Sequence, residues 1–394
     1  MVSKFANRVK NLAPAAVYEI LKATTEGKAI PFSAGNPGFE AIPHEKIANV
    51  AAKILAENPN TALQYGMTEG FAPLRGKITE FLQKNLNISA EKNRLLVTHG
   101  ATQAIELCAK AFCNEGDVVI TENPSFVGTL ATFSSYGINV AGVEMEHDGM
   151  NLDKLQEEFD KHEKVSFVYV IPDFHNPTGW TTSLEKRKRL YEMCLAKGTL
   201  ILEDDPYGML RYHGEKIPTL KSMDTEGIVL YVGSFSKLIS PGLRVGFLLA
   251  NDIYMDKITA AKQVSDVHTA MLNQMIINRF MEDYGLEAHI NEICGIYREK
   301  LQVALDSLDE HLGDYISYVK PEGGLYVYCK LPEHIDSIEF FKAGIEAGVA
   351  VVYGSAFSVD PDEKSQYFRI NFSSPSIEQL KRGIEILGEV MRKF

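Results

Sequence analysis

The sequence predicts an α/β fold in which a large, doubly wound and mainly parallel sheet is joined to a smaller α+β domain. Between residues 94 and 232, short apolar runs alternate with segments of helical periodicity, and such alternation requires crossover connections between parallel strands. After Asn251 the pattern changes to long helices, and short strands return only near the C-terminus. The 394 residues, 45% of them hydrophobic, suffice for two domains with sizeable cores.

The expected elements of the larger domain follow one another at regular intervals. Strands are predicted at residues 94–98, 118–121, 138–143, 165–170, 199–202 and 228–232. Helices are predicted between them, at residues 100–113, 124–136, 152–162 and 183–197. Sheets of this kind bind ligands beyond the C-terminal ends of their strands, so polar residues at those ends are the first candidates for a site.

The rest of the chain predicts the smaller domain. Helical patterns continue to about residue 312, with a break near residues 268–272 and a long connecting helix from about residue 287. Short strands are expected at residues 314–319, 325–329, 349–353 and 367–372, before a terminal helix from Ile377. We expect a large domain over residues 45–286 and a small domain built from residues 1–44 and 287–394.

Composition excludes several classes of protein. The chain has 40 Lys and Arg against 52 Asp and Glu, a formal net charge of −12, whereas nucleic-acid binding relies on an excess of basic side chains. Its apolar runs are far shorter than the roughly 20 residues that span a bilayer. The five cysteines include no C-x-x-C pair, which is typical of a reduced, cytoplasmic protein. No spacing typical of a metal site or a nucleotide-binding loop occurs.

The most informative segment is GSFSKLISPGLRVG, residues 233–246, directly after a predicted strand. The amine of Lys237 could form a Schiff base with a carbonyl cofactor. Arg244 could bind a phosphate at two points, and the hydroxyls of Ser234 and Ser236 could donate further hydrogen bonds. Taken alone, the segment could equally be a solvated surface loop.

Two further polar clusters follow neighbouring strands. Residues 176–179 (NPTG) come after the fourth strand, and residues 203–207 (EDDPY) come after the fifth. Each taken singly reads as a turn or a helix cap. Three clusters at consecutive strand ends predict one crevice that collects them all.

In combination, these motifs and Arg369 in YFRINF resemble the class I aminotransferases that use pyridoxal 5′-phosphate (PLP) and have fold type I. The resemblance runs from about Arg8 to the C-terminus. Within the family, residues 63–75 and 266–274 are similar to the branch of 2-aminoadipate and kynurenine aminotransferases.

The resemblance implies a role for each motif residue. Lys237 matches the lysine that forms the Schiff base and shuttles the proton, and Asp204 matches the carboxylate that faces the pyridine nitrogen. Asn176 and Tyr207 match the pair that hydrogen-bonds the phenolic oxygen of the cofactor. Arg369 matches the arginine that binds the substrate α-carboxylate.

The resemblance also implies a phosphate site at Gly100, Ala101 and Thr102, where a strand turns into a helix. Members of the family commonly have Ser-Gln after this glycine, whereas this chain has Ala101, which lacks a hydroxyl. The phosphate would therefore be bound by the backbone amides and Thr102. Phe126 matches an aromatic residue that stacks on the cofactor ring, and its alternative is an ordinary core position.

Three further positions are implied. Tyr65 matches a tyrosine that reaches the cofactor phosphate from the neighbouring subunit, which would require a homodimer; alternatively it packs within a loop. Gly35 matches a glycine over which the substrate passes. Tyr18 occupies the position where an arginine often meets the distal carboxylate of acidic substrates. Because a tyrosine cannot neutralise a carboxylate, this favours an apolar or aromatic amino donor.

We therefore expect an aminotransferase that moves an amino group from an aromatic, apolar or 2-aminoadipate-like L-amino acid to a 2-oxo acid, 2-oxoglutarate by family expectation, in a ping-pong reaction. An alternative is a PLP-dependent C–S lyase on the same fold, because the first chemical steps are shared. A non-enzymatic sensor fused to a DNA-binding module is disfavoured, because the resemblance begins near Arg8 and the net charge is acidic.

Overall fold

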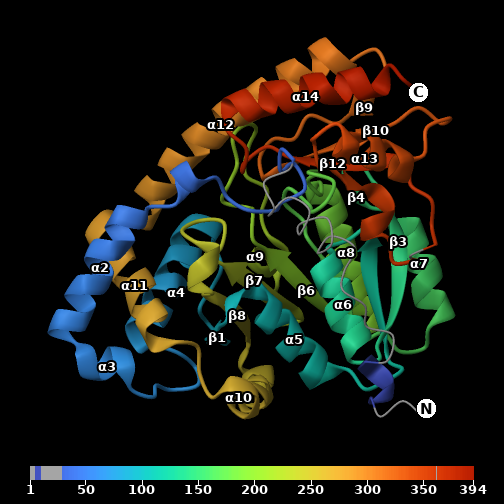
Figure 1. Cartoon of the computed structure of the whole chain (residues 1–394). Coiled ribbons are helices and arrows are strands. Elements are labelled where there is room, and N and C mark those ends of the chain that lie inside the picture. Colours follow the sequence, from blue (N-terminus) through green and yellow to red (C-terminus); the bar gives the residue numbers. More distant parts are fainter. Residues whose placement is uncertain (1–4, 10–28, 361) are drawn as a thin grey trace.

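The computed structural model describes residues 5–9, 29–360 and 362–394, and it contains two sheets (Figure 1). The larger sheet has eight strands in the order β1-β8-β7-β6-β5-β2-β3-β4. These are β1 (Asn93–Thr98), β2 (Val118–Asn123), β3 (Asn139–Glu146), β4 (Gly149–Met150), β5 (Phe167–Val170), β6 (Leu200–Asp205), β7 (Val229–Ser234) and β8 (Gly246–Asn251). The predicted α/β class and mainly parallel sheet are confirmed.

The centre of this sheet is parallel. Strands β3, β2, β5, β6 and β7 pair in parallel, so their C-terminal ends meet at one edge. Strand β8 is antiparallel to both β7 and β1. No strand was predicted at β8, whose apolar run directly follows the Lys237 segment.

Helices cover both faces of the larger sheet (Figure 1). They are α5 (Gly100–Phe112), α6 (Val127–Ser135), α7 (Leu152–Lys161), α8 (Leu184–Lys197), the short α9 (Leu220–Met223) and α10 (Asp252–Asp266). Side chains alternate along each strand. Thus Val168 packs with Leu155 of α7 and Leu190 of α8, whereas Tyr169 belongs to the cluster that contains Leu107 of α5.

The smaller sheet is antiparallel, in the order β11-β12-β10-β9. Its strands are β9 (Ser317–Tyr318), β10 (Tyr326–Lys330), β11 (Val352–Tyr353) and β12 (Tyr367–Asn371). Its helices are α12 (Leu286–Leu312), α13 (Ser337–Glu346) and α14 (Ile377–Met391). In Figure 1, α12 and α14 lie side by side along one edge of the molecule.

Residues 30–36 of the N-terminal segment pack against this second sheet, whereas η1 (Asn7–Val9) lies against α6 of the larger domain. The amide of Ile30 donates to the carbonyl of Gly348, and the amide of Asn371 in β12 donates to the carbonyl of Phe32. These bonds bring residues 33–36 next to β12. The exact domain limits, residues 44/45 and 286/287, stay a prediction.

The remaining helices pack together on one side of the larger sheet. They are α2 (His44–Glu57), α3 (Pro59–Leu63), α4 (Ala72–Leu86) and α11 (Met271–Tyr284), with the 3₁₀ turns η1 (Asn7–Val9), η2 (Phe39–Ala41), η3 (Pro241–Leu243) and η4 (Gly354–Phe357) elsewhere in the chain. Val50, Ile54 and Met275 form a small apolar cluster between α2 and α11. Within the described residues, no helix is long and apolar enough to cross a membrane.

Candidate active site

A cavity of about 350 Å³ opens where the parallel strand ends of the larger sheet meet β10 and β12 of the smaller one. The structure brings twelve of the predicted site residues to its wall: Gly35, Ala101, Thr102, Phe126, Asn176, Asp204, Tyr207, Ser234, Ser236, Lys237, Arg244 and Arg369. Gly100 lies directly behind this wall, against Arg244. Tyr65 lies elsewhere, and Tyr18 is outside the described residues.

Lys237 follows β7 and reaches across the cavity to the N-terminal segment. Its Nζ donates to the carbonyl of Gly35 at 2.7 Å. Burial, with Arg369 and Arg244 nearby, lowers the pKa of this amine to about 8. A sizeable fraction of the amine is therefore neutral near physiological pH, which is the form that attacks a carbonyl group.

Asp204 lies near the end of β6 and is buried. Its Oδ2 accepts a hydrogen bond from the hydroxyl of Tyr169 at 2.8 Å, whereas its Oδ1 has no hydrogen-bond partner in the protein. Burial raises the pKa of this carboxyl group to about 7, and the neighbouring Asp205 and Glu122 add to the effect. A buried oxygen without a partner at a cavity wall fits a ligand group that donates a hydrogen bond.

Arg369 comes from β12 and is buried. Its Nη1 donates to Oδ1 of Asn176 at 2.7 Å, and its Nη2 donates to the carbonyl of Ser33, also at 2.7 Å. The guanidinium carbon lies 4.3 Å from the ring centre of Tyr326 and 4.8 Å from that of Phe357. Burial lowers its pKa, and the Nε atom has no partner. Two rings and two fixed acceptors hold this cation in one orientation.

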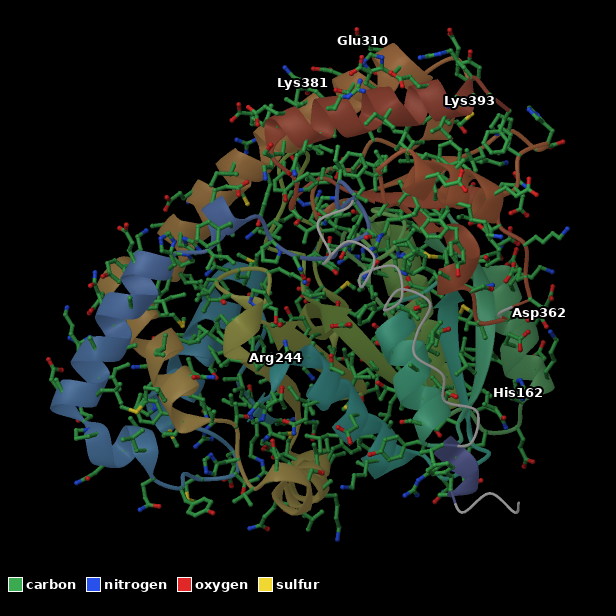
Figure 2. The ribbon with its side chains drawn as sticks, viewed as in Figure 1. His162, Arg244, Glu310, Asp362, Lys381 and Lys393 are labelled. Atoms are coloured by element: carbon green, nitrogen blue, oxygen red, sulfur yellow. The ribbon has the colours of Figure 1, made fainter. Side chains whose placement is uncertain are left out.

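The start of α5 forms another part of the wall. The first amides of a helix lack partners within it and attract anions. Gly100 has φ of +74°, and a Cβ there would lie 2.5 Å from Nη2 of Arg244, so only glycine fits. Arg244, near the centre of the molecule in Figure 2, donates to the carbonyl of His99 at 3.2 Å and to Oγ of Ser236 at 3.4 Å. This corner is the most suitable for a phosphate.

Sequence reasoning missed Tyr326 and Phe357 as members of the site. The hydroxyl of Tyr326 lies 3.3 Å from that of Tyr207, and a Cβ on Gly35 would lie 2.6 Å from the same hydroxyl. Tyr326 lies in an apolar run and looks like core, and Phe357 lies among small and polar residues (GSAFS) with no motif around it. The only available signal was the Gly323-Gly324 turn before β10, which indicates a close backbone approach.

Comparison with known proteins places this site in a family. The family model described as aminotransferase class I and II matches residues 27–387 of this chain. The chain belongs to this family. Aromatic-amino-acid aminotransferase 1 of Thermococcus litoralis is 34% identical over 99% of this chain and 94% of its own length. The 2-aminoadipate transaminase of Thermus thermophilus is 34% identical over 98% of this chain and 96% of its own.

Solved structures agree with this assignment. A multiple substrate aminotransferase from Thermococcus profundus superposes with a TM-score of 0.94 at 33% identity, covering 99% of this chain and 97% of that one. The α-aminoadipate aminotransferase of Thermus thermophilus, complexed with N-(5′-phosphopyridoxyl)-L-leucine, has a TM-score of 0.91 at 34% identity, with the same coverage. This chain is therefore a fold-type I aminotransferase that uses PLP.

The residues present in the aminotransferase fit this cofactor. The unpartnered Oδ1 of Asp204 suits a protonated ring nitrogen, and the cavity wall carries Arg244 and the hydroxyls of Ser234 and Ser236 for a phosphate. Phe126 supplies a partly buried aromatic surface to the same cavity. Among the described residues, no group of three His, Cys, Asp or Glu side chains could hold a metal ion.

Tyr65 of the aminotransferase does not reach the cavity of its own chain. It is 80% exposed, and its ring meets that of His268 edge-on at 5.8 Å. The neighbouring Leu63 and Met67 are also exposed. Apolar side chains gathered on a surface are typical of a binding face.

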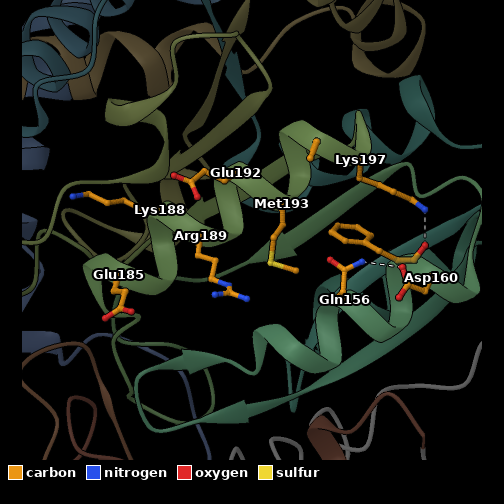
Figure 3. A pocket seen from close by; sticks show the side chains of 10 residues that line it. Gln156, Asp160, Glu185, Lys188, Arg189, Glu192, Met193 and Lys197 are labelled. Atoms are coloured by element: carbon orange, nitrogen blue, oxygen red, sulfur yellow. Dashed lines mark hydrogen bonds between the residues drawn. The ribbon is translucent and has the colours of Figure 1, made fainter.

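A second hollow, of about 640 Å³, lies between α7 and α8 (Figure 3). Most of the side chains that line it are charged or polar, with both signs of charge: Gln156, Phe159, Asp160, Glu185, Lys188, Arg189, Glu192, Met193, Ala196 and Lys197. It shares no residue with the cavity that holds Lys237.

Proposed function

We propose that this aminotransferase moves the amino group of an aromatic, apolar or 2-aminoadipate-like L-amino acid to a 2-oxo acid, with 2-oxoglutarate as the acceptor, in two half-reactions of a ping-pong cycle. The observation that carries this proposal is the convergence of Lys237, Asp204 and Arg369 on one cavity. An amine, a buried carboxylate and a guanidinium are the groups that covalent capture, ring activation and carboxylate binding require.

Lys237 is the proposed attachment point and the proton carrier. When bound, PLP supplies a carbonyl carbon for covalent capture and an electron-withdrawing ring that makes the substrate Cα–H acidic. Burial and two nearby arginines lower the pKa of the Lys237 amine to about 8, so a sizeable fraction of the free amine is neutral. In that form its Nζ could take the proton from the substrate Cα and give it to the carbonyl carbon that the cofactor supplies.

Asp204, Asn176 and Tyr207 hold the ring in the proposed site. The free Oδ1 of Asp204 would accept from the ring nitrogen, which favours the protonated and more electron-withdrawing ring. Asn176 and Tyr207 line the same cavity, where the amide and the hydroxyl can meet the phenolic oxygen. The Nη1 bond from Arg369 fixes the amide of Asn176 through its Oδ1, and this leaves the Nδ2 donors to face the cofactor.

Arg369 is the proposed binding site of the substrate carboxylate. Its guanidinium is already oriented by Ser33, Asn176 and two rings, so little conformational entropy remains to be lost on binding. A planar fork matches a carboxylate at two points. Arg369 and Lys237 line the same cavity, so a substrate held by its carboxylate could meet the lysine amine there.

The lining of the cavity supports the substrate class. Among the described residues that line the cavity, the apolar ones include Ile105, Phe126, Val127, Phe357 and the ring of Tyr326, and the cationic ones are Lys237, Arg244 and Arg369. All three cations already have proposed partners. An aromatic or apolar side chain therefore suits this part of the wall, in agreement with the aromatic and multiple-substrate activities in the names of the relatives.

We also infer a homodimer in which Tyr65 completes the phosphate site of the partner subunit. Its exposure, together with that of Leu63 and Met67, supports this arrangement. A cytoplasmic setting is supported by the cysteines, since all five are free in the structure.

The test of the proposal is a half-reaction screen on the purified holoenzyme. Individual amino acids are added while the visible absorbance of the cofactor is followed, and 2-oxo acids are then added to restore it. We expect aromatic amino acids to bleach the absorbance and 2-oxoglutarate to restore it. The Lys237→Ala variant should show neither change. Release of pyruvate and ammonia from S-alkylcysteine without a 2-oxo acid would instead assign the chain as a C–S lyase.

A further inference from the structure

Tyr169 is buried beneath the cavity and is not one of the residues that line it. It lies on β5, in register with Leu202 of β6. Because side chains two residues apart on a strand share a face, Tyr169 and Asp204 lie on the same face of the sheet, towards α5 and α6. The strand register thus puts the phenol beside the carboxylate.

The hydroxyl of Tyr169 makes two hydrogen bonds in series. It donates to Oδ2 of Asp204 at 2.8 Å and accepts from Oγ1 of Thr129 at 3.0 Å. Thr129 is buried in the first turn of α6, where its amide donates to the carbonyl of Phe126 at 2.9 Å. A continuous chain therefore runs from the backbone beside the stacking Phe126 to the carboxylate at the ring nitrogen.

We propose that Tyr169 is a positioning residue: its hydroxyl holds Asp204 by Oδ2, so that Oδ1 alone is presented to the cofactor, and Thr129 fixes that hydroxyl in turn. Three observations carry this assignment. Tyr169 is the only hydrogen-bond partner that the described side chains offer to Asp204, Oδ1 is buried and unpaired, and the ring of Tyr169 is itself fixed edge-on against Phe133.

The proposal predicts how cofactor binding changes when the hydroxyl is removed. Without it, Asp204 loses its one fixed contact in a buried site, and both of its oxygens become unpaired. The carboxylate is then free to rotate and easier to protonate, so it holds the ring nitrogen less well. This inference rests on the proposed site geometry but not on the identity of the substrates.

The experiment measures the dissociation constant of PLP for Tyr169→Phe by equilibrium titration of the apoprotein. We expect that constant to rise about tenfold, as for loss of one hydrogen bond to a charged group. Thr129→Val should give a smaller rise in the same direction. It keeps the proposal testable if Tyr169→Phe does not fold.

A matched control is available one strand away. Tyr231 of β7 is also buried and donates to an aspartate of β6, Oδ2 of Asp205, at 2.7 Å. Asp205 and Asp204 are adjacent on the strand and therefore point to opposite faces. Tyr231→Phe removes the same kind of bond and should leave the affinity for PLP unchanged.

A double-mutant cycle separates positioning from general structure. If Tyr169 acts through Asp204, then Tyr169→Phe should have little further effect on PLP affinity in the Asp204→Asn background. Additive effects, or a wild-type PLP affinity for Tyr169→Phe, would overturn the inference. Because PLP binding is read without any substrate, failure of the proposed transamination would leave this test intact.

Discussion

Arg369 of β12 donates a 2.7 Å hydrogen bond to Asn176, a residue 193 positions earlier in the chain. This bond joins the smaller sheet to the loop that follows β5 of the larger one. Both residues line the cavity, where the cofactor and the substrate carboxylate would meet. The binding of substrate and the orientation of Asn176 are thereby linked, and the consequences can be measured.

Arg369→Lys should weaken substrate binding more than it slows the chemical step. A lysine cannot reproduce the two-point fork or keep both acceptors, Ser33 and Asn176. We expect the KM for the amino donor to rise about 10- to 100-fold, because one charge-assisted hydrogen bond contributes about 1.5–3 kcal/mol. Steady-state kinetics measure this, with the partly exposed Arg279→Lys as control. An unchanged KM would contradict the proposed role.

Gly35→Ala should lower activity through a steric clash with Tyr326, and Tyr326→Phe should partly relieve that clash. The new Cβ would lie 2.6 Å from the hydroxyl oxygen of Tyr326 but 3.7 Å from its ring carbon Cζ. We expect kcat/KM to fall by about tenfold or more for Gly35→Ala, and Tyr326→Phe in the same chain to restore part of it. Gly76→Ala, where a Cβ meets nothing within 4 Å, is the control. A double variant as impaired as Gly35→Ala would show that this contact is not the cause.

Gly100→Ala should weaken binding of the cofactor phosphate. It forces a side chain into a backbone with φ of +74° and against Arg244, at a cost of about 1–3 kcal/mol from the backbone alone. We expect the dissociation constant of PLP to rise at least about tenfold, measured by titration of the apoprotein. Gly295→Ala is the control, because a Cβ at this position of α12 meets nothing within 4 Å. This variant should bind PLP as the wild type does.

The rate of PLP capture by the apoprotein should depend on pH through Lys237. Only the neutral amine attacks the carbonyl group, and burial holds its pKa at about 8. The rate should therefore rise with pH and reach half of its maximum near pH 8. It should become constant once the amine is fully neutral. Arg369→Gln removes a nearby positive charge, so its half-point should move to higher pH. Stopped-flow absorbance records both profiles, and coincident profiles would contradict this account of the pKa.

Tyr65 offers a test of the shared site. Tyr65→Ala and Lys237→Ala should each be poorly active alone, because every site lacks one group. In a mixed dimer, one site would combine the intact Lys237 of one subunit with Tyr65 of the partner subunit, and activity should return on co-expression. If mixing restores nothing, Tyr65 does not complete the site of the partner subunit.

Much of this protein could be predicted from the order of its residues. The alternation of apolar runs with helical segments identified the parallel part of the sheet, since strand and helix periodicities are local properties. The three polar clusters at strand ends identified where a ligand would bind. Strand β8 was missed, because an apolar run directly after a functional motif carries no separate local signal.

Other parts of the site depend on contacts that the sequence does not display. Tyr326 lies in an apolar run and resembles an ordinary core residue, and Phe357 lies in GSAFS, which has no functional motif. Only the folded chain brings their rings to the guanidinium of Arg369. Tyr169 likewise looks like one more aromatic residue of a buried strand. Its hydroxyl acquires a partner through the register of β5 with β6, a relationship between distant segments.

The three consecutive acids after the fifth predicted strand show the division most clearly. The sequence determined that carboxylates lie at this strand end, and family resemblance pointed to Asp204. The tertiary structure gives each acid a different environment. Glu203 accepts from the amides of Leu220 and Lys221 at the start of α9, and Asp205 accepts from Tyr231. Only Asp204 keeps a buried oxygen free at the cavity, because alternation along β6 turns it alone towards the face where the ligand binds.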